Sequence, residues 1–442
     1  MPPQLAALIC ILFIIYLFWT DIKKSDDTSM ALWIPLLWMF FAGSRYVSEW
    51  LNLGAPMQGN DAYLEGNLWN SASFMALMIA GMVVLVRRRI NWSEVFTKNA
   101  WIWLFFIYGG ISILWSDYPF VSFKRLIKAS GNVIMVLVIL TDQRPYEAIG
   151  TILRRLAFVF LPLSVLFIKY YPDLGRGFTQ AGFAMYTGVA TQKNGLGAIC
   201  LLSSIYFGWS LLLHRREESK LGRLLNIPTI IVLLFMIVWL FNMANSSTSL
   251  ACMIVAICLF LVSRLPAMSH QPKRIIVFII ICIAVFGLLE WSFDIKDQLI
   301  AMLGRRPDLT TRVPMWEHLL TMVKNPIAGF GYDSFWLGDR MEIVQARWGH
   351  LMQAHNGYLE IYLNLGFIGL FIIAGQILSG LRKVSRHLAI DYSAAILRLC
   401  FIVVVVLYNY TEATFYGVSG MWVLFLLGVM ERPGQQKSIN NI

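Results

Sequence analysis

The sequence predicts an all-α membrane protein with many transmembrane helices. Of its 442 residues, 58% are hydrophobic and only 14% are charged, and the mean hydropathy is +0.65, which is too apolar for a soluble protein of this length. The apolar residues form repeated runs about as long as the roughly 20 residues that a spanning helix needs. One long polar stretch, 290–360, interrupts these runs. Because its backbone groups cannot remain unpaired in hydrocarbon, we expect it to lie at one membrane face.

Thirteen apolar runs are expected to span the membrane, and the total is uncertain by about one because several are shorter than a full crossing needs. The first run is expected to be retained, since no basic residue precedes it and no cleavage site follows it. The runs are 5–19, 30–43, 69–86, 100–115, 127–141, 156–168, 195–213, 226–242, 248–262, 275–289, 361–381, 394–409 and 416–430.

These runs divide the chain into three parts. Residues 1–289 are expected to hold the first ten spans, with a short outer loop at 169–194. Residues 290–360 form the large, partly helical outer loop, where we expect the chemistry. Residues 361–442 hold the last spans and a cytoplasmic tail.

The distribution of basic residues predicts the orientation. Alternate loops contain 21 Lys and Arg, whereas the opposite short loops contain 6. Since basic loops stay in the cytoplasm, the long loop is expected outside and the C-terminus inside. The net charge of +11 is then explained by contact with anionic lipid at the cytoplasmic face, and no nucleic acid partner is expected.

Several kinds of site are absent from the sequence. The six cysteines all lie in apolar runs, away from any disulfide or metal pattern. There is no phosphate-binding GxxxxGK[ST] loop, dinucleotide fingerprint, HExxH or paired Cys/His spacing. We therefore expect no metal and no cofactor. The small number of charges within the spans counts against an ion-coupled transporter.

The long loop contains a helix that is expected to begin at Arg312. It should stop at 324–326, before a sharp turn at Gly329 and Gly331. An arginine at a helix N-terminus adds a bidentate charge to free backbone N–H groups, and together these suit a phosphate. The alternative is that Arg312 pairs with Asp308 or another acid of the loop.

A histidine stands at the end of the long loop. His355 and Asn356 directly precede a span, so His355 is expected at the outer mouth of the bundle. There it can take a proton from an attacking hydroxyl or donate a hydrogen bond to a phosphate. The alternative is an interfacial histidine that helps to cap the helix. His318 and His350 are weaker candidates.

The shorter outer loop also carries cations. Arg176 and Lys193 lie among several glycines, and Asn194 follows. Two cations beside flexible backbone suit a diphosphate, although they could equally snorkel or pair at the interface. The hydroxyl residues at 246–249 either line a polar pocket or satisfy backbone groups where a helix breaks.

Taken together, the short motifs over about residues 110–430 resemble the bacterial O-antigen ligase and O-antigen polymerase superfamily, with exopolysaccharide polymerases as the nearest members. Each motif alone is weak, but their order and topology match as well. The motifs are TQKNGLG at 191–197, STS at 247–249, RVPMW at 312–316, NPIAGFG at 325–331, and HNGYL at 355–359 with Gly366 and Gly369.

This resemblance implies a metal-independent, inverting glycosyltransferase with a GT-C-like fold. It would work on the periplasmic face of the bacterial inner membrane, with an undecaprenyl-diphosphate-linked oligosaccharide as donor. Arg312 and Arg176 would hold the diphosphate, and His355 would act on the acceptor hydroxyl or the leaving phosphate. The residues that would line the substrate site are Lys193, Asn194, Asn356 and Trp316.

Three functions remain open from the sequence. The first is polymerisation of exopolysaccharide or O-antigen, with a lipid-linked repeat unit as acceptor and a chain-length regulator as a further partner. The second is ligation of the finished glycan to lipid A core. The third, from another class, is a transporter or flippase of lipid-linked sugars, whose cations would line a path through the membrane.

Overall fold

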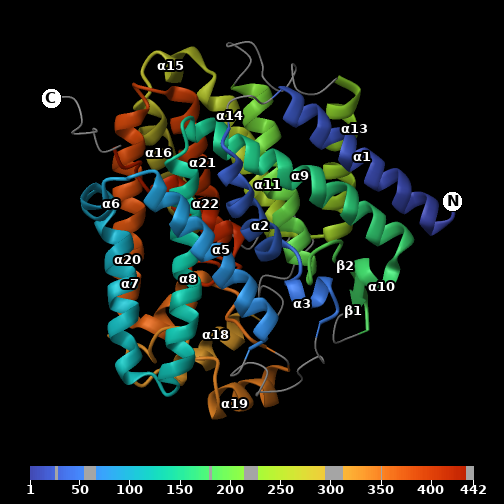
Figure 1. The fold of residues 1–442 in the computed structure, drawn as a ribbon. Helices are drawn as coiled ribbons and strands as arrows, with labels where there is room; N and C mark the ends of the chain where they lie inside the picture. Colours follow the sequence, from blue (N-terminus) through green and yellow to red (C-terminus); the bar gives the residue numbers. More distant parts are fainter. Residues whose placement is uncertain are drawn as a thin grey trace.

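The computed structural model describes residues 1–24, 28–53, 66–178, 182–213, 227–293, 312–349 and 351–434. Helices make up nearly all of the regular structure in these residues (Figure 1). The longer helices are α1 (Pro3–Lys24), α2 (Trp33–Gly43), α5 (Leu68–Arg87), α7 (Ala100–Ser112), α8 (Pro119–Leu140), α9 (Pro145–Tyr170), α11 (Lys193–Leu212), α13 (Ile227–Ala244), α14 (Ser247–Ser263), α16 (Arg274–Phe293), α18 (Arg312–Thr321), α19 (Asp339–Trp348), α20 (Gly357–His387), α21 (Tyr392–Tyr408) and α22 (Gly420–Val429).

Short elements connect these helices. Two three-residue strands, β1 (Arg176–Phe178) and β2 (Ala184–Tyr186), pair antiparallel, with Arg176 opposite Tyr186. The short helices are η1 (Met30–Leu32), α3 (Val47–Trp50), α6 (Trp92–Lys98), η2 (Ile113–Trp115), α10 (Pro172–Gly175) and α15 (Pro266–Ser269).

The predicted fold class is confirmed: the chain is an all-α polytopic membrane protein. Every one of the thirteen predicted spans coincides with a helix in the described residues. Six of these helices are long and apolar enough to cross a membrane: α1, α5, α9, α11, α13 and α20. The helices α2, α7, α14, α21 and α22 are apolar but shorter.

Helices α8 and α9 begin well before the apolar runs predict, and α8 starts at Pro119 rather than at 127. Helix α9 starts at Pro145 rather than at 156, so Arg154 and Arg155 lie within a helix and not in a loop. Both are only 6% exposed, and both donate to the carboxylate of Asp21 at the end of α1. The helix can bury these charges because they are paired. The explanation of the net charge assumed that these two arginines contact anionic lipid. That assumption is wrong for both, because they are buried on Asp21.

Burial separates a central group of helices from a peripheral one. The most hydrophobic stretch of α9 is 83% buried and that of α11 is 72% buried, whereas the values are 22% for α5 and 28% for α1. Apolar side chains on α1 and α5 face outward, as expected of helices that contact lipid. Helices α9, α11, α21 and α22 thus supply much of the buried interior of the bundle, and Figure 1 shows α11, α21 and α22 near its centre.

The polar loop folds against one end of the bundle. Figure 1 shows α18 and α19 together at this end, while α15 lies at the opposite end. The two helices share a small hydrophobic cluster of their own, which includes Leu319, Trp336 and Val344. Contacts with α8 and with the end of α7 hold the loop in place: Arg125 pairs with Asp333 at 3.1 Å, and the Tyr332 N–H donates to Ser112 Oγ at 2.9 Å.

The turn that follows α18 docks into a break in α20. Gly366 has a φ of 61°, so the helical hydrogen bonds are interrupted there. Backbone groups of the turn replace them: the Gly331 N–H donates to the Asn364 carbonyl at 2.8 Å, and the Phe367 N–H donates to the Pro326 carbonyl at 2.9 Å. A Cβ atom on Gly366 would lie 2.2 Å from the Ile327 carbonyl oxygen. Only glycine fits such a conformation with so close a neighbour.

Candidate functional site

Four helices begin beside one turn of the chain, residues 409–412. Helices α11, α14, α18 and α20 start at Lys193, Ser247, Arg312 and Gly357. The Gly357 N–H donates to the carbonyls of Asn409, at 2.8 Å, and of Glu412, at 2.9 Å, and the hydroxyls of Thr248 and Thr411 are hydrogen-bonded. A helix N-terminus carries a partial positive charge and free N–H groups. The first N–H groups of α20 are already hydrogen-bonded, so the N-termini that favour an anion at this place are those of α11, α14 and α18.

A single buried carboxylate joins three of the predicted site residues. Glu412 is 6% exposed. Its Oε1 atom lies 3.3 Å from Arg312 Nη2 and accepts a 2.7 Å hydrogen bond from Asn194 Nδ2. Its Oε2 atom lies 3.6 Å from His355 Nδ1. The structure thus brings Arg312, Asn194 and His355 together, although they are far apart in the sequence.

His355 has an unusual backbone conformation. Its φ is 49°, a left-handed value that residues other than glycine rarely adopt. The Nδ1 atom is buried, and at 3.6 Å from Glu412 it is beyond hydrogen-bonding distance, while the whole side chain is 24% exposed. Strained residues of this kind cluster at functional sites. The ring therefore contacts the carboxylate on one side and remains accessible in part.

Arg312 has an acidic partner, but not one in its own loop. It also donates to the Thr411 carbonyl through Nη1, and its side chain is 21% exposed. The alternative that Arg312 pairs with an acid is therefore correct in part, since Glu412 belongs to a different segment. Asp308, the partner suggested by spacing, lies outside the described residues. An arginine held by a carboxylate and a carbonyl has a fixed position, which is what bidentate recognition of a phosphate needs.

The other predicted substrate residues surround this cluster in different ways. Lys193 is the first residue of α11 and is half-buried. Asn356 is the N-cap of α20, where its side chain accepts from the backbone N–H groups of Tyr358 and Leu359, each at 3.0 Å. The cap is therefore Asn356 rather than His355. The indole N–H of Trp316, on α18, donates to the Ala354 carbonyl at 2.7 Å.

Arg176 is engaged elsewhere in the described structure. It lies on β1, its Nε and Nη2 atoms donate to the Ile168 carbonyl at 3.0 and 2.8 Å, and its guanidinium stacks over Tyr186. Figure 1 shows β1 and β2 beside α10, at the side of the bundle. Its role in holding a diphosphate stays a prediction. Lys193 directly precedes Asn194, which contacts Glu412.

Two weaker candidates have structural partners. His318 Nδ1 accepts from the Trp348 indole at 3.1 Å, which ties α18 to α19. The hydroxyl segment lies at the break between α13 and α14, where Ser246 is the N-cap and donates to Ser249 Oγ at 3.1 Å. These contacts join side chains, and Ser246 makes no side-chain cap hydrogen bond, so neither explanation of the hydroxyls is decided. His350 lies outside the described residues.

Glu412 is the site residue that the sequence analysis missed. The loop between 394–409 and 416–430 contains no basic residue, so the pattern of outer cations does not point to it. One signal was available: Glu412 is the only charged residue in that loop. An isolated acid between two apolar runs is costly near a membrane and is therefore a candidate for function.

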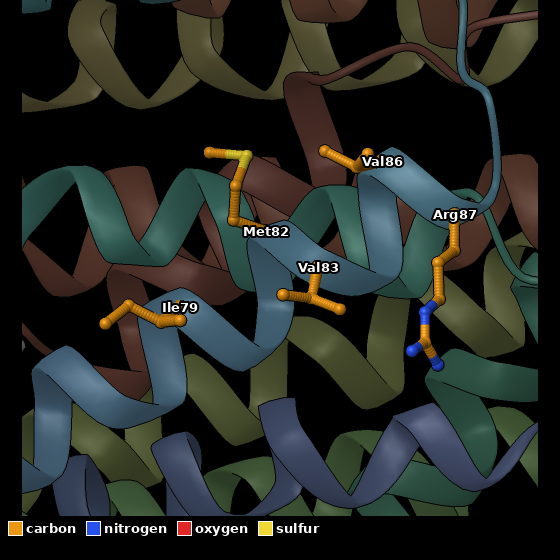
Figure 2. Close-up of a pocket in the computed structure, with 5 residues that line it drawn as sticks. All are labelled: Ile79, Met82, Val83, Val86 and Arg87. Carbon is orange, nitrogen blue, oxygen red and sulfur yellow. The ribbon is translucent and has the colours of Figure 1, made fainter.

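A hollow on the surface lies away from this cluster. Figure 2 shows it on the outer face of α5, lined by Ile79, Met82, Val83, Val86 and Arg87, with a volume of about 360 Å³. It lies at the C-terminal end of α5, where Arg88 pairs with Asp142 just after α8. The polar loop contacts the other end of α8, through Arg125 and Asp333, so the hollow is far from the loop. Its lining is almost entirely apolar and it is wide open. It lacks the polar groups that define a site for a charged substrate.

Fold and site together define a multi-pass membrane protein with a buried charged cluster at one end of its helical bundle. Residues 231–374 match the family model described as O-antigen ligase, a region that includes Arg312 and His355. This part of the chain is thus similar to O-antigen ligases, and the resemblance inferred from the motifs is confirmed.

Similar proteins carry related names. The chain is 24% identical over 293 residues to the exopolysaccharide production protein ExoQ of Rhizobium meliloti, an alignment that covers 63% of each protein. It is 23% identical over 349 residues to a protein of Rickettsia conorii named "Putative polysaccharide ligase", covering 73% of this chain and 80% of the relative. A protein of the same name from Rickettsia felis is 22% identical over 368 residues, or 80% of this chain and 85% of the relative. The match thus spans less than two thirds of ExoQ.

Proposed function

We propose that this protein is a glycosyltransferase of polysaccharide assembly. It transfers a glycan from an undecaprenyl-diphosphate-linked donor to a sugar hydroxyl, on the periplasmic face of the inner membrane, and polymerises repeat units. The observation that carries this proposal is the Glu412 carboxylate, which holds Arg312 on one side and faces His355 on the other. A cation and a proton acceptor are thereby placed at one site, as transfer from a diphosphate requires.

The proposed reaction is a direct displacement at the anomeric carbon of the donor. The acceptor hydroxyl oxygen forms the new glycosidic bond while the bond between the anomeric carbon and the diphosphate oxygen breaks. His355 takes the hydroxyl proton, and the undecaprenyl diphosphate leaves with the bonding electron pair. A single displacement inverts the anomeric centre and uses no carboxylate nucleophile, unlike a retaining mechanism.

The leaving diphosphate gains negative charge in the transition state, and fixed positive groups stabilise it. Arg312 supplies a full charge, Lys193 a second, and the N-termini of α11, α14 and α18 supply partial charges. This arrangement supports a reaction that needs no metal ion. Asn194, held on Glu412 at 2.7 Å, keeps the start of α11 against the cluster.

The relatives also support a second candidate function of the same class. The matched family model is described as O-antigen ligase, and the Rickettsia relatives are named as polysaccharide ligases. A ligase would use the same donor site and transfer the finished glycan to lipid A core. Polymerisation is preferred because of the similarity to an exopolysaccharide production protein. The two differ only in the acceptor.

Alanine at His355 or Arg312 is expected to lower the rate of glycan transfer by about 10²-fold or more, the usual effect of losing a general base or a charge stabiliser. The measurement uses the full-length protein in detergent with EDTA, an undecaprenyl-diphosphate-linked repeat unit as donor, and either a second repeat unit or lipid A core as acceptor. Wild-type turnover on the repeat unit supports a polymerase, and turnover on lipid A core alone supports a ligase.

Matched controls come from the same loop. His318→Ala removes a histidine that bonds to Trp348, and Arg347→Ala removes an exposed arginine of α19. Both are expected to keep near wild-type rates. The proposed site is refuted when His355→Ala and Arg312→Ala transfer glycan as fast as these controls. A wild-type protein that moves lipid-linked sugars across a vesicle membrane, without transfer, would instead identify a flippase.

A further inference from the structure

We infer that Trp316 and Glu360 are positioning residues that fix His355 by holding the peptide groups of the preceding residue from two sides. This inference rests on the proposed function and deepens it, because it assigns roles that neither the family match nor the motifs provide. The two side chains belong to different parts of the structure, α18 of the loop and α20 of the bundle.

The contacts centre on Ala354. This residue is fully buried, and its carbonyl accepts a 2.7 Å hydrogen bond from Trp316 Nε1. Its N–H donates a 2.8 Å hydrogen bond to Glu360 Oε2. Both backbone groups of the residue next to His355 are therefore bound by side chains rather than by regular secondary structure.

This double contact explains how His355 keeps its strained conformation. A left-handed φ is unfavourable for a residue with a Cβ, so it persists only where the surroundings enforce it. On the N-terminal side of His355, both backbone groups of Ala354 are hydrogen-bonded. On its C-terminal side, Asn356 caps α20 and the Gly357 N–H is hydrogen-bonded. The turn is thus fixed on both sides, and the imidazole is directed at Glu412.

Glu360 is suited to this role only as a carboxylate. Its Oε1 atom accepts from the Trp336 indole, from the Tyr416 hydroxyl at 2.8 Å and from Asn364 Nδ2 at 3.2 Å, while Oε2 accepts from Ala354. Four donors face two oxygens, an arrangement that suits a carboxylate. A glutamine would retain most of these bonds with its oxygen at the Oε1 position. Its NH₂ group would then face the Ala354 N–H, and that contact would be lost.

Trp316 also connects the two halves of the site. It lies four residues after Arg312, one turn along α18, so the same helix fixes the cation and supports the histidine. The indole N–H donates to the Ala354 carbonyl, and this hydrogen bond explains a tryptophan at this position without a contact to the substrate. A shift of α18 would therefore displace Arg312 and His355 together.

The test measures kinetics of Glu360→Gln and Trp316→Phe in the full-length protein. Each is expected to lower kcat for glycan transfer by about 10- to 100-fold, because a displacement of the order of 1 Å at a catalytic group has effects of this size. The donor KM should change by less than about 3-fold, since the groups that bind the diphosphate are unchanged. A parallel fall in kcat and rise in KM would contradict a positioning role.

A double-mutant cycle separates positioning from general stability. In the His355→Ala background, Glu360→Gln should lower the remaining rate by less than about 2-fold, because the group through which it acts is already absent. A merely structural role would give the same loss with and without His355. That additive result overturns the inference, whereas a His355→Ala variant with full activity would overturn the proposed function instead.

Two controls use similar groups with other partners. Tyr416→Phe removes one of the three donors to Glu360 Oε1 and leaves the Ala354 contact intact. Trp348→Phe removes an indole hydrogen bond to His318 in the same loop. Both are expected to keep kcat within about 3-fold of wild type. A loss as large as that of Glu360→Gln in either control would show that any disturbance of this region lowers activity.

Discussion

Glutamine in place of Glu412 is expected to lower kcat for glycan transfer by about 10²- to 10³-fold, within the range measured for groups that assist an acid or base. The carboxylate faces His355 Nδ1 and contacts Arg312 Nη2, so it orients both the proposed base and the proposed charge stabiliser. A neutral amide retains the shape but not the charge that stabilises a protonated imidazole. The measurement is steady-state glycan transfer by the purified protein in detergent.

The donor KM is expected to respond in the opposite sense. A carboxylate close to the diphosphate repels it, so the loss of this charge removes an unfavourable interaction with the donor. We therefore expect the KM of Glu412→Gln to remain unchanged or to fall, while kcat falls strongly. Arg312→Ala should differ, because it removes an attractive charge and should raise KM as well as lower kcat.

The control for this prediction is an acid at the same end of the molecule with no contact to the cluster. Asp339 is exposed at the start of α19, and Asp339→Asn should keep wild-type kinetics. Glu412→Gln must also remain folded, which size-exclusion chromatography and thermal unfolding can establish. If the folded variant has wild-type kcat, Glu412 serves only to hold helices together and has no part in transfer.

The fold could be predicted from the sequence to a large extent, because a helix that lies in lipid must be apolar along its length and therefore appears as an apolar run. Each apolar run corresponds to a helix. The errors lie at the ends, where a charged residue was taken as the end of a span. Arg154 and Arg155 extend α9 into that region because Asp21, more than 130 residues earlier, neutralises them. Pairing across such a distance is not visible in local sequence.

The site could be predicted in part. Arg312, Asn194 and His355 lie at or just before the start of a helix, where sequences carry local signals, and the structure places all three around Glu412, while their roles stay predictions. Glu412, which joins them, lies in a short loop with no such signal. The use of Trp316 on a backbone carbonyl could not be inferred, since it depends on how the loop folds against α20. The roles of Glu412 and Trp316 depend on tertiary contacts, which cannot be inferred from a single sequence.

Gly366 illustrates the same limit. The sequence indicates close packing around Gly366 and Gly369, and the structure shows that Gly366 breaks α20 and receives the turn at 326–331. The sharp turn predicted at Gly329 and Gly331 is consistent with their φ values of 68° and 96°. What could not be predicted is that the two features fit each other. The turn and the break in α20 each supply the backbone hydrogen bonds that the other lacks.

The largest expected effect on stability is that of Asp21→Asn. Asp21 has no exposed surface, and its two oxygens accept from Arg154 Nε and Arg155 Nε, each at 2.7 Å. Without the carboxylate, two guanidinium groups remain buried without a counter-charge. Breaking a buried ion pair in this way typically costs about 3–5 kcal/mol. We expect a loss of this size in the free energy of unfolding, measured by reversible denaturation in detergent micelles.

Two further variants test the reason for this loss. Glu94→Gln breaks a pair with Lys98 in which both side chains are at least 34% exposed, and exposed pairs contribute only about 0–1 kcal/mol. Adding Arg155→Met to Asp21→Asn should recover part of the lost stability, because one stranded charge is then removed. The Arg155 guanidinium also lies over Trp33, at 5.1 Å from the ring. If the double variant is less stable than Asp21→Asn alone, this packing contributes more stability than the stranded charge removes, and unpaired charge does not explain the loss in Asp21→Asn.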